Sequence, residues 1–237
     1  MIRYLALLAM LTPIAVPPTA SAHTPHRVHA RTAAPAAVLA PRPAATTARG
    51  LVASAWDIGP TIEGRNYSRN TPPSPSAVRG GMAVDIPGAP GSVHYVTRAS
   101  APLAGARRIV MRYRIDLAPG ARIYARTAPD HPGMLTLYFQ RAGDTWSGNG
   151  RYEAYRWYAT FATDHELAAG EHTMVAPLDA LWTAVERSSA ANNPRGFAGA
   201  LAETDRIGFV LGGGDGYGHG VYASGPARIV VTDFHVE

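Results

Sequence analysis

The segment LTLYFQ at residues 135–140 decides the fold, because its apolar and polar side chains alternate at every position. In an extended strand, one face would carry Leu135, Leu137 and Phe139, and the other would carry Thr136, Tyr138 and Gln140. Alternation with a period of two is typical of a half-buried strand. We therefore expect a strand with one face in the core and the other toward solvent.

The same alternation recurs on both sides of this segment. Similar runs occupy residues 82–86, 93–97, 109–116, 152–161, 207–211 and 230–236, and clusters of Gly and Pro separate them. Many short alternating strands joined by turns predict an all-β fold, an antiparallel β-sandwich. Helical spacing is confined to residues 177–185 and 197–202, so we expect one or two short helices at the edge of the sandwich.

Composition excludes several kinds of chemistry. The chain has 237 residues, of which 46% are hydrophobic, and this is enough for one sizeable core. It contains no Cys, and all 22 of its basic residues are Arg. Disulfides, thiolate metal sites, cysteine nucleophiles, a phosphate-loop lysine and a pyridoxal Schiff base are therefore excluded.

The first 50 residues of the chain divide into two segments ahead of the domain. Residues 1–22 carry Arg3, an apolar run and Ala-Ser-Ala before the expected cleavage point, which is typical of a signal peptide. The run meets Pro13 too early to span a bilayer. Residues 23–50 are rich in Ala, Pro and Thr and predict a disordered linker. We expect a secreted protein, periplasmic or extracellular, with no membrane span and with its β-sandwich domain at 51–237.

The net charge of +5 belongs to the segments that precede the domain. Five of the 22 Arg lie before residue 51, and the remaining 17 match the 17 Asp and Glu, all of which lie in residues 51–237. A domain that binds nucleic acid would show excess positive charge on its folded part. We therefore expect no nucleic-acid partner.

Polar and aromatic residues gather on the outward face that the central strands should share. If residues 135–141 and 152–161 pair as a hairpin, that face and its loop would present Tyr138, Gln140, Trp146, Tyr152, Arg156 and Tyr158. Aromatic rings stack on the C–H faces of sugars, and Arg and Gln direct hydrogen bonds to hydroxyls. Arg112, Arg114 and Arg156 could pair with a uronate carboxylate. The face suits a polysaccharide or glycan, although an ordinary amphipathic sheet has the same pattern.

A glycine-rich segment, GGGDGYGHG at residues 212–220, follows the strand at 207–211. Glycine permits positive φ and close approach of a ligand or another strand. Asp215, Tyr217 and His219 are separated by glycines and could point the same way, closing the rim of a ligand site. A tight structural crossover and a catalytic Asp–His pair remain open, whereas no nucleotide-binding motif is matched.

Two carboxylates could hold a structural Ca²⁺. Asp57 lies near the first strand and Asp233 in the last, and these strands are neighbours in many sandwiches. The alternative is a pair of unconnected carboxylates. No catalytic residue is assigned, because GxSxG is absent and HELAA at 165–169 lacks the second His of a zincin.

Two stretches resemble the galactose-binding-like jelly-roll sandwiches found among carbohydrate-binding modules. They are the closing strand ARIVVTDFHV at 227–236 and the aromatic strand at 152–158. The resemblance implies a jelly roll, non-catalytic carbohydrate binding, and a structural calcium site to which Asp233 would belong. Residues 207–221 also resemble a glycine-rich stretch of uncharacterised exported bacterial proteins, which implies a cellular context and no activity.

Two other functions remain as alternatives. The domain also resembles jelly-roll polysaccharide lyases in having suitable residue types, namely Tyr158, His219, Arg156 and Gln140, but it lacks their Gln-Ile-His or Gln-Val-His strand. A polysaccharide-cleaving enzyme, lyase or glycoside hydrolase, could use the same face. A structural domain without a small ligand would instead pack its outward aromatics against loops or another chain. The sequence sets no oligomeric state.

Overall fold

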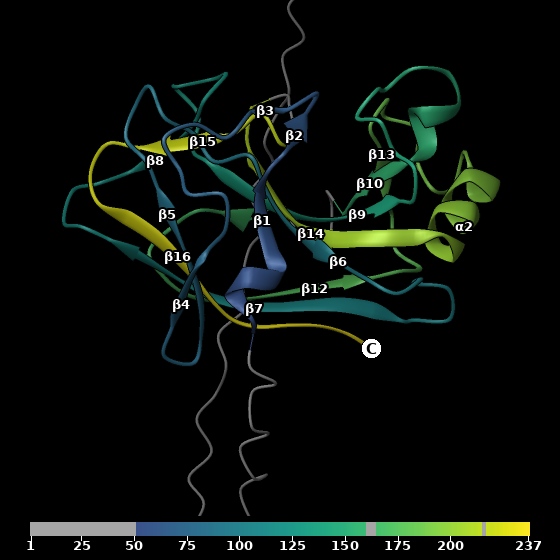
Figure 1. Ribbon diagram of the computed structural model, residues 1–237, viewed down its shortest axis with the longest axis horizontal. Helices are drawn as coiled ribbons and strands as arrows, with labels where there is room; N and C mark the ends of the chain where they lie inside the picture. Colours follow the sequence, from purple (N-terminus) through teal and green to yellow (C-terminus); the bar gives the residue numbers. More distant parts are fainter. Residues whose placement is uncertain (1–50, 160–164, 215–216) are drawn as a thin grey trace, which may run out of the picture. The chain divides into compact units, whose positions relative to one another are not determined.

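The structure, a computed structural model, describes residues 51–159, 165–214 and 217–237. The expected signal peptide at 1–22 and linker at 23–50 lie outside these residues. The described part consists mostly of strands in antiparallel sheets, which confirms the all-β sandwich (Figure 1). None of its helices is long and apolar enough to cross a membrane.

The first sheet contains the segment 135–140, from whose alternation the β fold is predicted. Its strands, in spatial order, are β1 (Trp56–Gly59), β6 (Tyr95–Ala99), β14 (Thr204–Gly212), β9 (Met134–Arg141), β10 (Arg156–Tyr158) and β13 (Thr183–Ala184). A seventh strand, β11 (His165–Glu166), pairs with the other end of β9. The strands β9 and β10 pair in antiparallel register, so the expected hairpin is confirmed.

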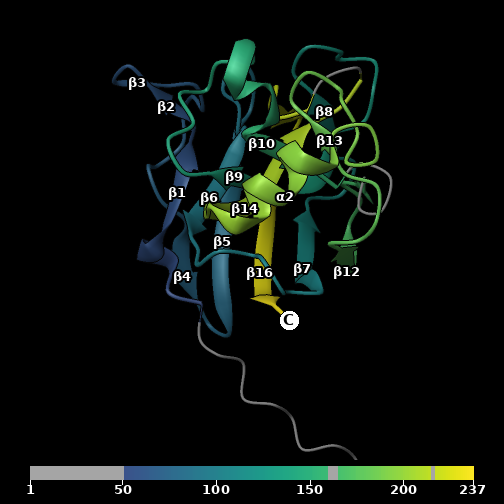
Figure 2. The same ribbon diagram turned by 90° about the vertical axis from the view of Figure 1, so that its right-hand side faces the viewer.

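The second sheet closes the sandwich. Its spatial order is β12 (Gly170–Pro177), β7 (Arg108–Leu117), β16 (Ala227–Val236), β5 (Gly81–Ile86) and β4 (Ser76–Val78). Figure 2 shows β5, β16 and β7 side by side, in agreement with their pairing. Two short ladders complete the strands: β2 (Thr61–Ile62) with β3 (Arg65–Asn66), and β8 (Ile123–Ala125) with β15 (Val221–Ala223).

The core lies between the two sheets and is rich in aromatic rings. Trp56 of β1 meets Phe234 of β16 edge to face, with ring centroids 5.0 Å apart, so the two sheets touch directly. Trp157 and Phe139 fill the inner face of the first sheet, and both have no exposed surface. Such rings each bury a large apolar area, so they contribute strongly to the stability of the core.

One of the two expected helices forms and the other does not. Helix α2 (Pro194–Ala202) starts where Asn193 accepts a hydrogen bond from the Gly196 amide, and Pro194 occupies its first turn. Two 3₁₀ turns, η1 (Ala53–Ala55) and η2 (Gly150–Ala154), supply the other helical residues of the described part. Residues 177–185 form turns and β13 instead, because Trp182 folds into the core and donates its indole N–H to the Pro177 carbonyl.

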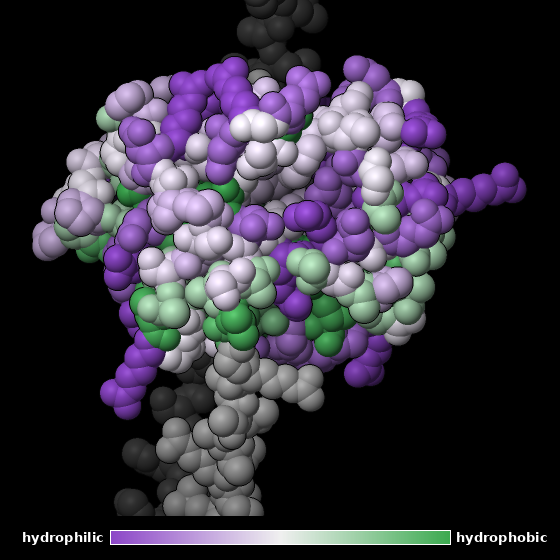
Figure 3. All heavy atoms as spheres, viewed as in Figure 1, coloured by the Kyte–Doolittle hydropathy of each residue, from purple (hydrophilic) through white to green (hydrophobic). Residues whose placement is uncertain are grey.

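The face of the molecule seen in Figure 3 is mostly hydrophilic, with hydrophobic residues in small groups toward the lower edge. Scattered groups of this size are normal on a soluble domain. The outer face of the first sheet, where the sequence places the polar aromatic residues, is the expected position of a functional site.

Candidate functional site

The outer face of the first sheet carries four of the residues that the sequence singled out. Arg156 lies opposite Gln140, and Tyr158 lies opposite Tyr138, in the register of β10 and β9. All four alternate with residues such as Trp157 that face the core. The expectation that these side chains share one outward face is therefore confirmed.

That face is not open to solvent, so the expectation of an exposed aromatic platform is wrong. Tyr138 is 0% exposed, Tyr158 2%, Gln140 3% and Arg156 4%. Loops after β9 and β14 fold over the sheet and form a second apolar cluster that we call the outer aromatic layer. Its members are Tyr95, Tyr138, Tyr158 and Val210, with Trp146, Val185 and Tyr217 packed against them.

Three tyrosine rings of this layer stack in a row that begins on two neighbouring strands, where Tyr138 and Tyr158 lie opposite each other. The Tyr138 and Tyr158 centroids lie 6.1 Å apart with a 21° interplanar angle, and those of Tyr158 and Tyr217 lie 5.1 Å apart at 25°. Tyr217 is only partly buried, whereas the other two rings are enclosed. The stack therefore ends at the surface on the Tyr217 ring, which packs against the buried Tyr158 ring.

Hydroxyl pairs join the buried tyrosines across the sheet. The Tyr95 and Tyr158 hydroxyls lie 2.8 Å apart, and the Tyr138 hydroxyl bonds that of Thr97. Gly208 lies between Thr97 and Tyr138 in the register, and its missing side chain leaves the path open. Burial raises the pKa of Tyr95, Tyr138 and Tyr158. These phenols stay protonated at neutral pH and do not supply a tyrosinate base.

A buried ion pair fixes the loop that carries Trp146. Arg156 donates to Asp144 at 2.7 Å, and the two side chains are 4% and 0% exposed. Gln140 Nε2 donates to the same carboxylate oxygen at 2.8 Å, and the Trp146 amide donates to the other at 2.9 Å. The guanidinium of Arg156 also lies 5.0 Å from the Trp146 ring centroid. Arg156 and the Gln140 amide nitrogen are thus bonded internally, whereas Gln140 Oε1 has no hydrogen-bond partner among the described residues. Both side chains are buried, so the expectation that they lie on an open ligand-binding face is wrong.

Asp144 was missed by the sequence analysis, although a local signal was present. Its carboxylate accepts from an amide two residues ahead, a turn that Asp commonly initiates. Trp146 has a positive φ of 66°, which is rare for a bulky residue and shows that the surrounding contacts determine this loop. Trp146 itself is half-buried and meets Tyr95 edge to face at 5.0 Å.

The glycine-rich segment covers the other end of the layer. Gly218 and Gly220 have φ of 65° and 90°, and a Cβ at these positions would lie 2.3 Å from the Tyr95 ring and 2.5 Å from the His94 ring. Close approach therefore requires glycine. Tyr217 points onto the layer while His219 is exposed, so the expectation that they point the same way is wrong. Asp215 lies outside the described residues.

His94 holds this segment from below. Its Nδ1–H donates to the Gly218 carbonyl at 3.0 Å, and the Ser92 hydroxyl lies 3.0 Å from Nε2. Burial, together with the positive charge of Arg126, lowers the pKa of His94 to about 4. The ring is therefore neutral at neutral pH. No local sequence pattern indicates this contact, because 124 residues separate the two partners.

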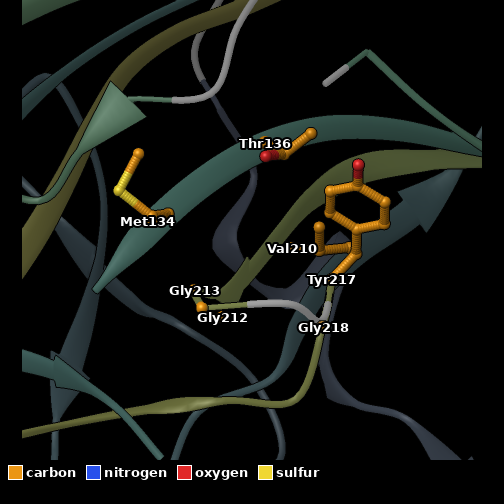
Figure 4. Close-up of a pocket in the computed structure, with 8 residues that line it drawn as sticks. Met134, Thr136, Val210, Gly212, Gly213, Tyr217 and Gly218 are labelled. Atoms are coloured by element: carbon orange, nitrogen blue, oxygen red, sulfur yellow. The ribbon is translucent and has the colours of Figure 1, made fainter. Parts of the chain in front are cut away.

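A small pocket lies where the glycine-rich segment leaves the sheet. It encloses about 40 Å³ and is lined by Met134, Thr136, Val210, Gly212, Gly213, Gly214, Tyr217 and Gly218. Figure 4 shows the Tyr217 ring beside Val210, with Thr136 across from it. The pocket thus joins the exposed end of the tyrosine stack to polar backbone groups of the glycines.

Tyr152 does not belong to the outer aromatic layer, which corrects another expectation. It lies in the 3₁₀ turn η2 ahead of β10, because the strand begins only at Arg156. Its hydroxyl accepts a 2.7 Å hydrogen bond from Arg151, and this bond lowers the pKa of Tyr152.

The other arginines proposed for a uronate lie on the second sheet. Arg112 and Arg114 belong to β7, and Arg114 is bonded to Asp116 at 2.6 Å. They are therefore not neighbours of Arg156 on one surface, and the expected three-arginine site is wrong.

The two carboxylates of the expected calcium site point away from each other. Asp57 alternates with the core residue Trp56 on the first sheet and pairs with Arg206 at 3.5 Å. Asp233 precedes the core residue Phe234 on the second sheet and pairs with His235 at 3.1 Å. They face opposite sides of the sandwich. Among the described residues, no group of three or more His, Asp or Glu could hold a metal ion.

Comparison with known proteins adds no family to this picture. The chain matches no protein-family model and no curated protein sequence. The functional argument therefore rests on the geometry of the outer aromatic layer and its pocket.

Proposed function

We propose that the domain is a non-catalytic module that binds carbohydrate in the pocket beside Tyr217. The observation that carries the proposal is the stack of Tyr138, Tyr158 and Tyr217, which ends on a partly exposed ring at the pocket wall. The rings first expected to contact the sugar support this platform from beneath.

The stack suits a sugar for two physical reasons. An aromatic face complements the C–H face of a pyranose, and a ring already held by its neighbours loses little conformational freedom on binding. Thr136 and the backbone of Gly212 and Gly213 add polar groups beside the ring. Because the pocket is small, it fits the edge of one sugar unit, and we expect modest affinity.

Export is part of this proposal. The signal-like residues 1–22 would take the domain outside the cytoplasm, where polysaccharides of cell surfaces and the environment are found. Fractionation of cells that produce the full chain tests this step. Accumulation of the shortened protein outside the cytoplasm supports it, and full-length protein retained inside contradicts it.

A purely structural domain is the main competitor, because it also predicts outward aromatics that pack against loops, as Trp146 and Tyr217 do. The two proposals differ at Tyr217, which a structural domain needs only for packing. The lyase alternative receives less support, since the buried Tyr158 stays protonated and Arg156 is paired with Asp144.

The test is equilibrium binding of the wild type and two variants to a panel of neutral and acidic polysaccharides. We expect at least one polysaccharide to bind, and Tyr217→Ala to weaken it at least tenfold. Tyr152→Ala, which removes a half-exposed ring of the 3₁₀ turn η2 outside the outer aromatic layer, should bind as the wild type does. Failure of every polysaccharide, or equal binding by Tyr217→Ala, would reject the proposal. Unsaturated sugar ends appearing during incubation would indicate a lyase instead.

A further inference from the structure

A continuous chain of contacts links two exposed arginines to the pocket through His94. Arg69 exchanges backbone hydrogen bonds with Ser92, whose hydroxyl lies 3.0 Å from His94 Nε2. His94 bonds the Gly218 carbonyl, and Gly218 lines the pocket. On the other side, Arg126 Nε donates to the His219 carbonyl at 2.8 Å, and its amide donates to Gly220.

The two arginines along this chain carry positive charges that have no carboxylate partner among residues 51–159, 165–214 and 217–237. Arg69, Arg126 and His219 are all exposed. Six other arginines of the described residues form ion pairs, but no ion pair in the described part of the chain includes Arg69 or Arg126. We call Arg69, Arg126 and His219 the basic rim.

We propose that the basic rim binds the carboxylate of a uronic-acid-containing polysaccharide while a sugar unit of the same chain contacts Tyr217. The inference rests on the proposed carbohydrate function and names its ligand class. The guanidinium group is suited to this task, because its planar donors match a carboxylate in bidentate geometry. Arg156, Arg112 and Arg114 do not form this site, since they lie elsewhere and Arg156 is buried.

The electrostatic environment of His94 supports the grouping of these side chains into one basic rim. After burial, the side chains that lower the pKa of His94 are Arg126, His219 and Arg69. Residues 51–237 hold equal numbers of Arg and acidic residues. The positive potential is thus a local feature, and it is too small to follow a nucleic-acid backbone.

Binding to polygalacturonate and to a neutral galactan tests the inference. The wild type should bind polygalacturonate at least tenfold more tightly than the galactan, with the difference shrinking as salt is added. Arg126→Gln and Arg69→Gln should each weaken polygalacturonate binding several-fold and leave galactan binding unchanged. Arg69→Gln is the cleaner variant, because the Arg69 side chain has no hydrogen bond or ion pair to any residue that the structure describes. Arg195→Gln, on the exposed surface of α2, is the matched control.

The outcomes separate the two proposals. If galactan binds through Tyr217 and polygalacturonate has no advantage, this inference fails and the carbohydrate function stands. If neither polymer nor any other glycan binds, both fail. Equal competition by single-stranded DNA, or unchanged polygalacturonate binding in both rim variants, also overturns the inference.

Discussion

Asp144 and Arg156 form an ion pair, with a nitrogen–oxygen distance of 2.7 Å, beneath the outer aromatic layer, and both side chains are removed from solvent. The pair connects the loop after β9 to β10 and positions Trp146 over Tyr95. A charge buried without its partner is strongly unfavourable. The pair therefore determines whether the layer stays covered.

Removal of the carboxylate should unfold this region. Asp144→Ala leaves Arg156 buried and unpaired, and we expect a loss of about 3–5 kcal/mol in the free energy of unfolding. Chemical denaturation followed by Trp fluorescence measures the loss. The exposed Asp116, bonded to Arg114, provides the control, and Asp116→Ala should change stability little. Equal effects of the two substitutions would contradict the importance of burial.

Two buried tyrosines should respond oppositely to loss of their hydroxyl. Tyr138→Phe leaves Thr97 without its partner and should lower the free energy of unfolding by about 1 kcal/mol. The Tyr113 hydroxyl has no hydrogen-bond partner among the described residues, so Tyr113→Phe should be neutral or stabilising. Thermal melts of both variants test this pair, and a larger loss in Tyr113→Phe would show the hydroxyl assignments to be wrong.

The stability of the domain should fall in mild acid because of His94. Its pKa is about 4 in the folded state and 6.5 when unperturbed, so the unfolded chain takes up the proton first as the pH drops. The contribution of neutral His94 to the free energy of unfolding is fully present above pH 6.5. It is lost as the pH falls toward about 4, and the loss amounts to about 3 kcal/mol. Unfolding measured across this range should show a flatter acid limb for His94→Gln than for the wild type.

His235 supplies the opposite sign within the same molecule. A hydrogen bond to Glu237, with Asp233 contributing, raises the pKa of His235. Its contribution is therefore full at low pH and is lost as the pH rises through the folded-state pKa. Replacement of His235 should leave the acid limb as steep as in the wild type, which separates the His94 effect from general acid sensitivity.

The glycine-rich segment should tolerate a methyl group poorly at Gly218. Gly218 and Gly143 both have positive φ, but only the added Cβ at Gly218 would meet a neighbour, the Tyr95 ring at 2.3 Å. Gly143→Ala should cost about 1 kcal/mol from backbone conformation alone. Gly218→Ala should cost about 1–3 kcal/mol more, from the steric contact. Similar melting temperatures for the two variants would contradict the close approach.

The strands could be predicted from the sequence because their pattern is local. Alternation in residues 135–140 correctly assigned Phe139 to the core and Tyr138 to the opposite face, and the pairing of β9 with β10 followed. What alternation does not report is whether the opposite face is covered. The cover depends on two loops. Asp144 holds Trp146 by a local contact two residues away, whereas His94 holds Gly218, the neighbour of Tyr217, across 124 residues of the chain.

The helix expected at 177–185 does not form, and the reason is related. Its apolar residues have helical spacing, but Leu181 stays 41% exposed while Trp182 enters the core, so they do not form one buried stripe. Period alone does not distinguish a helix from a turn that buries its large residues separately. The glycines of residues 212–220 predict that the backbone approaches another group closely. They do not predict that the groups approached are the rings of Tyr95 and His94.

The measurement that tests the central claim most directly is an NMR titration of the domain with fragments of a polysaccharide that it binds. The account predicts chemical-shift changes that concentrate on Thr136, Gly212, Gly213 and Tyr217 around the pocket, with β12 and β7 of the second sheet unaffected. Shift changes confined to the second sheet, or no changes at saturating fragment, would contradict it.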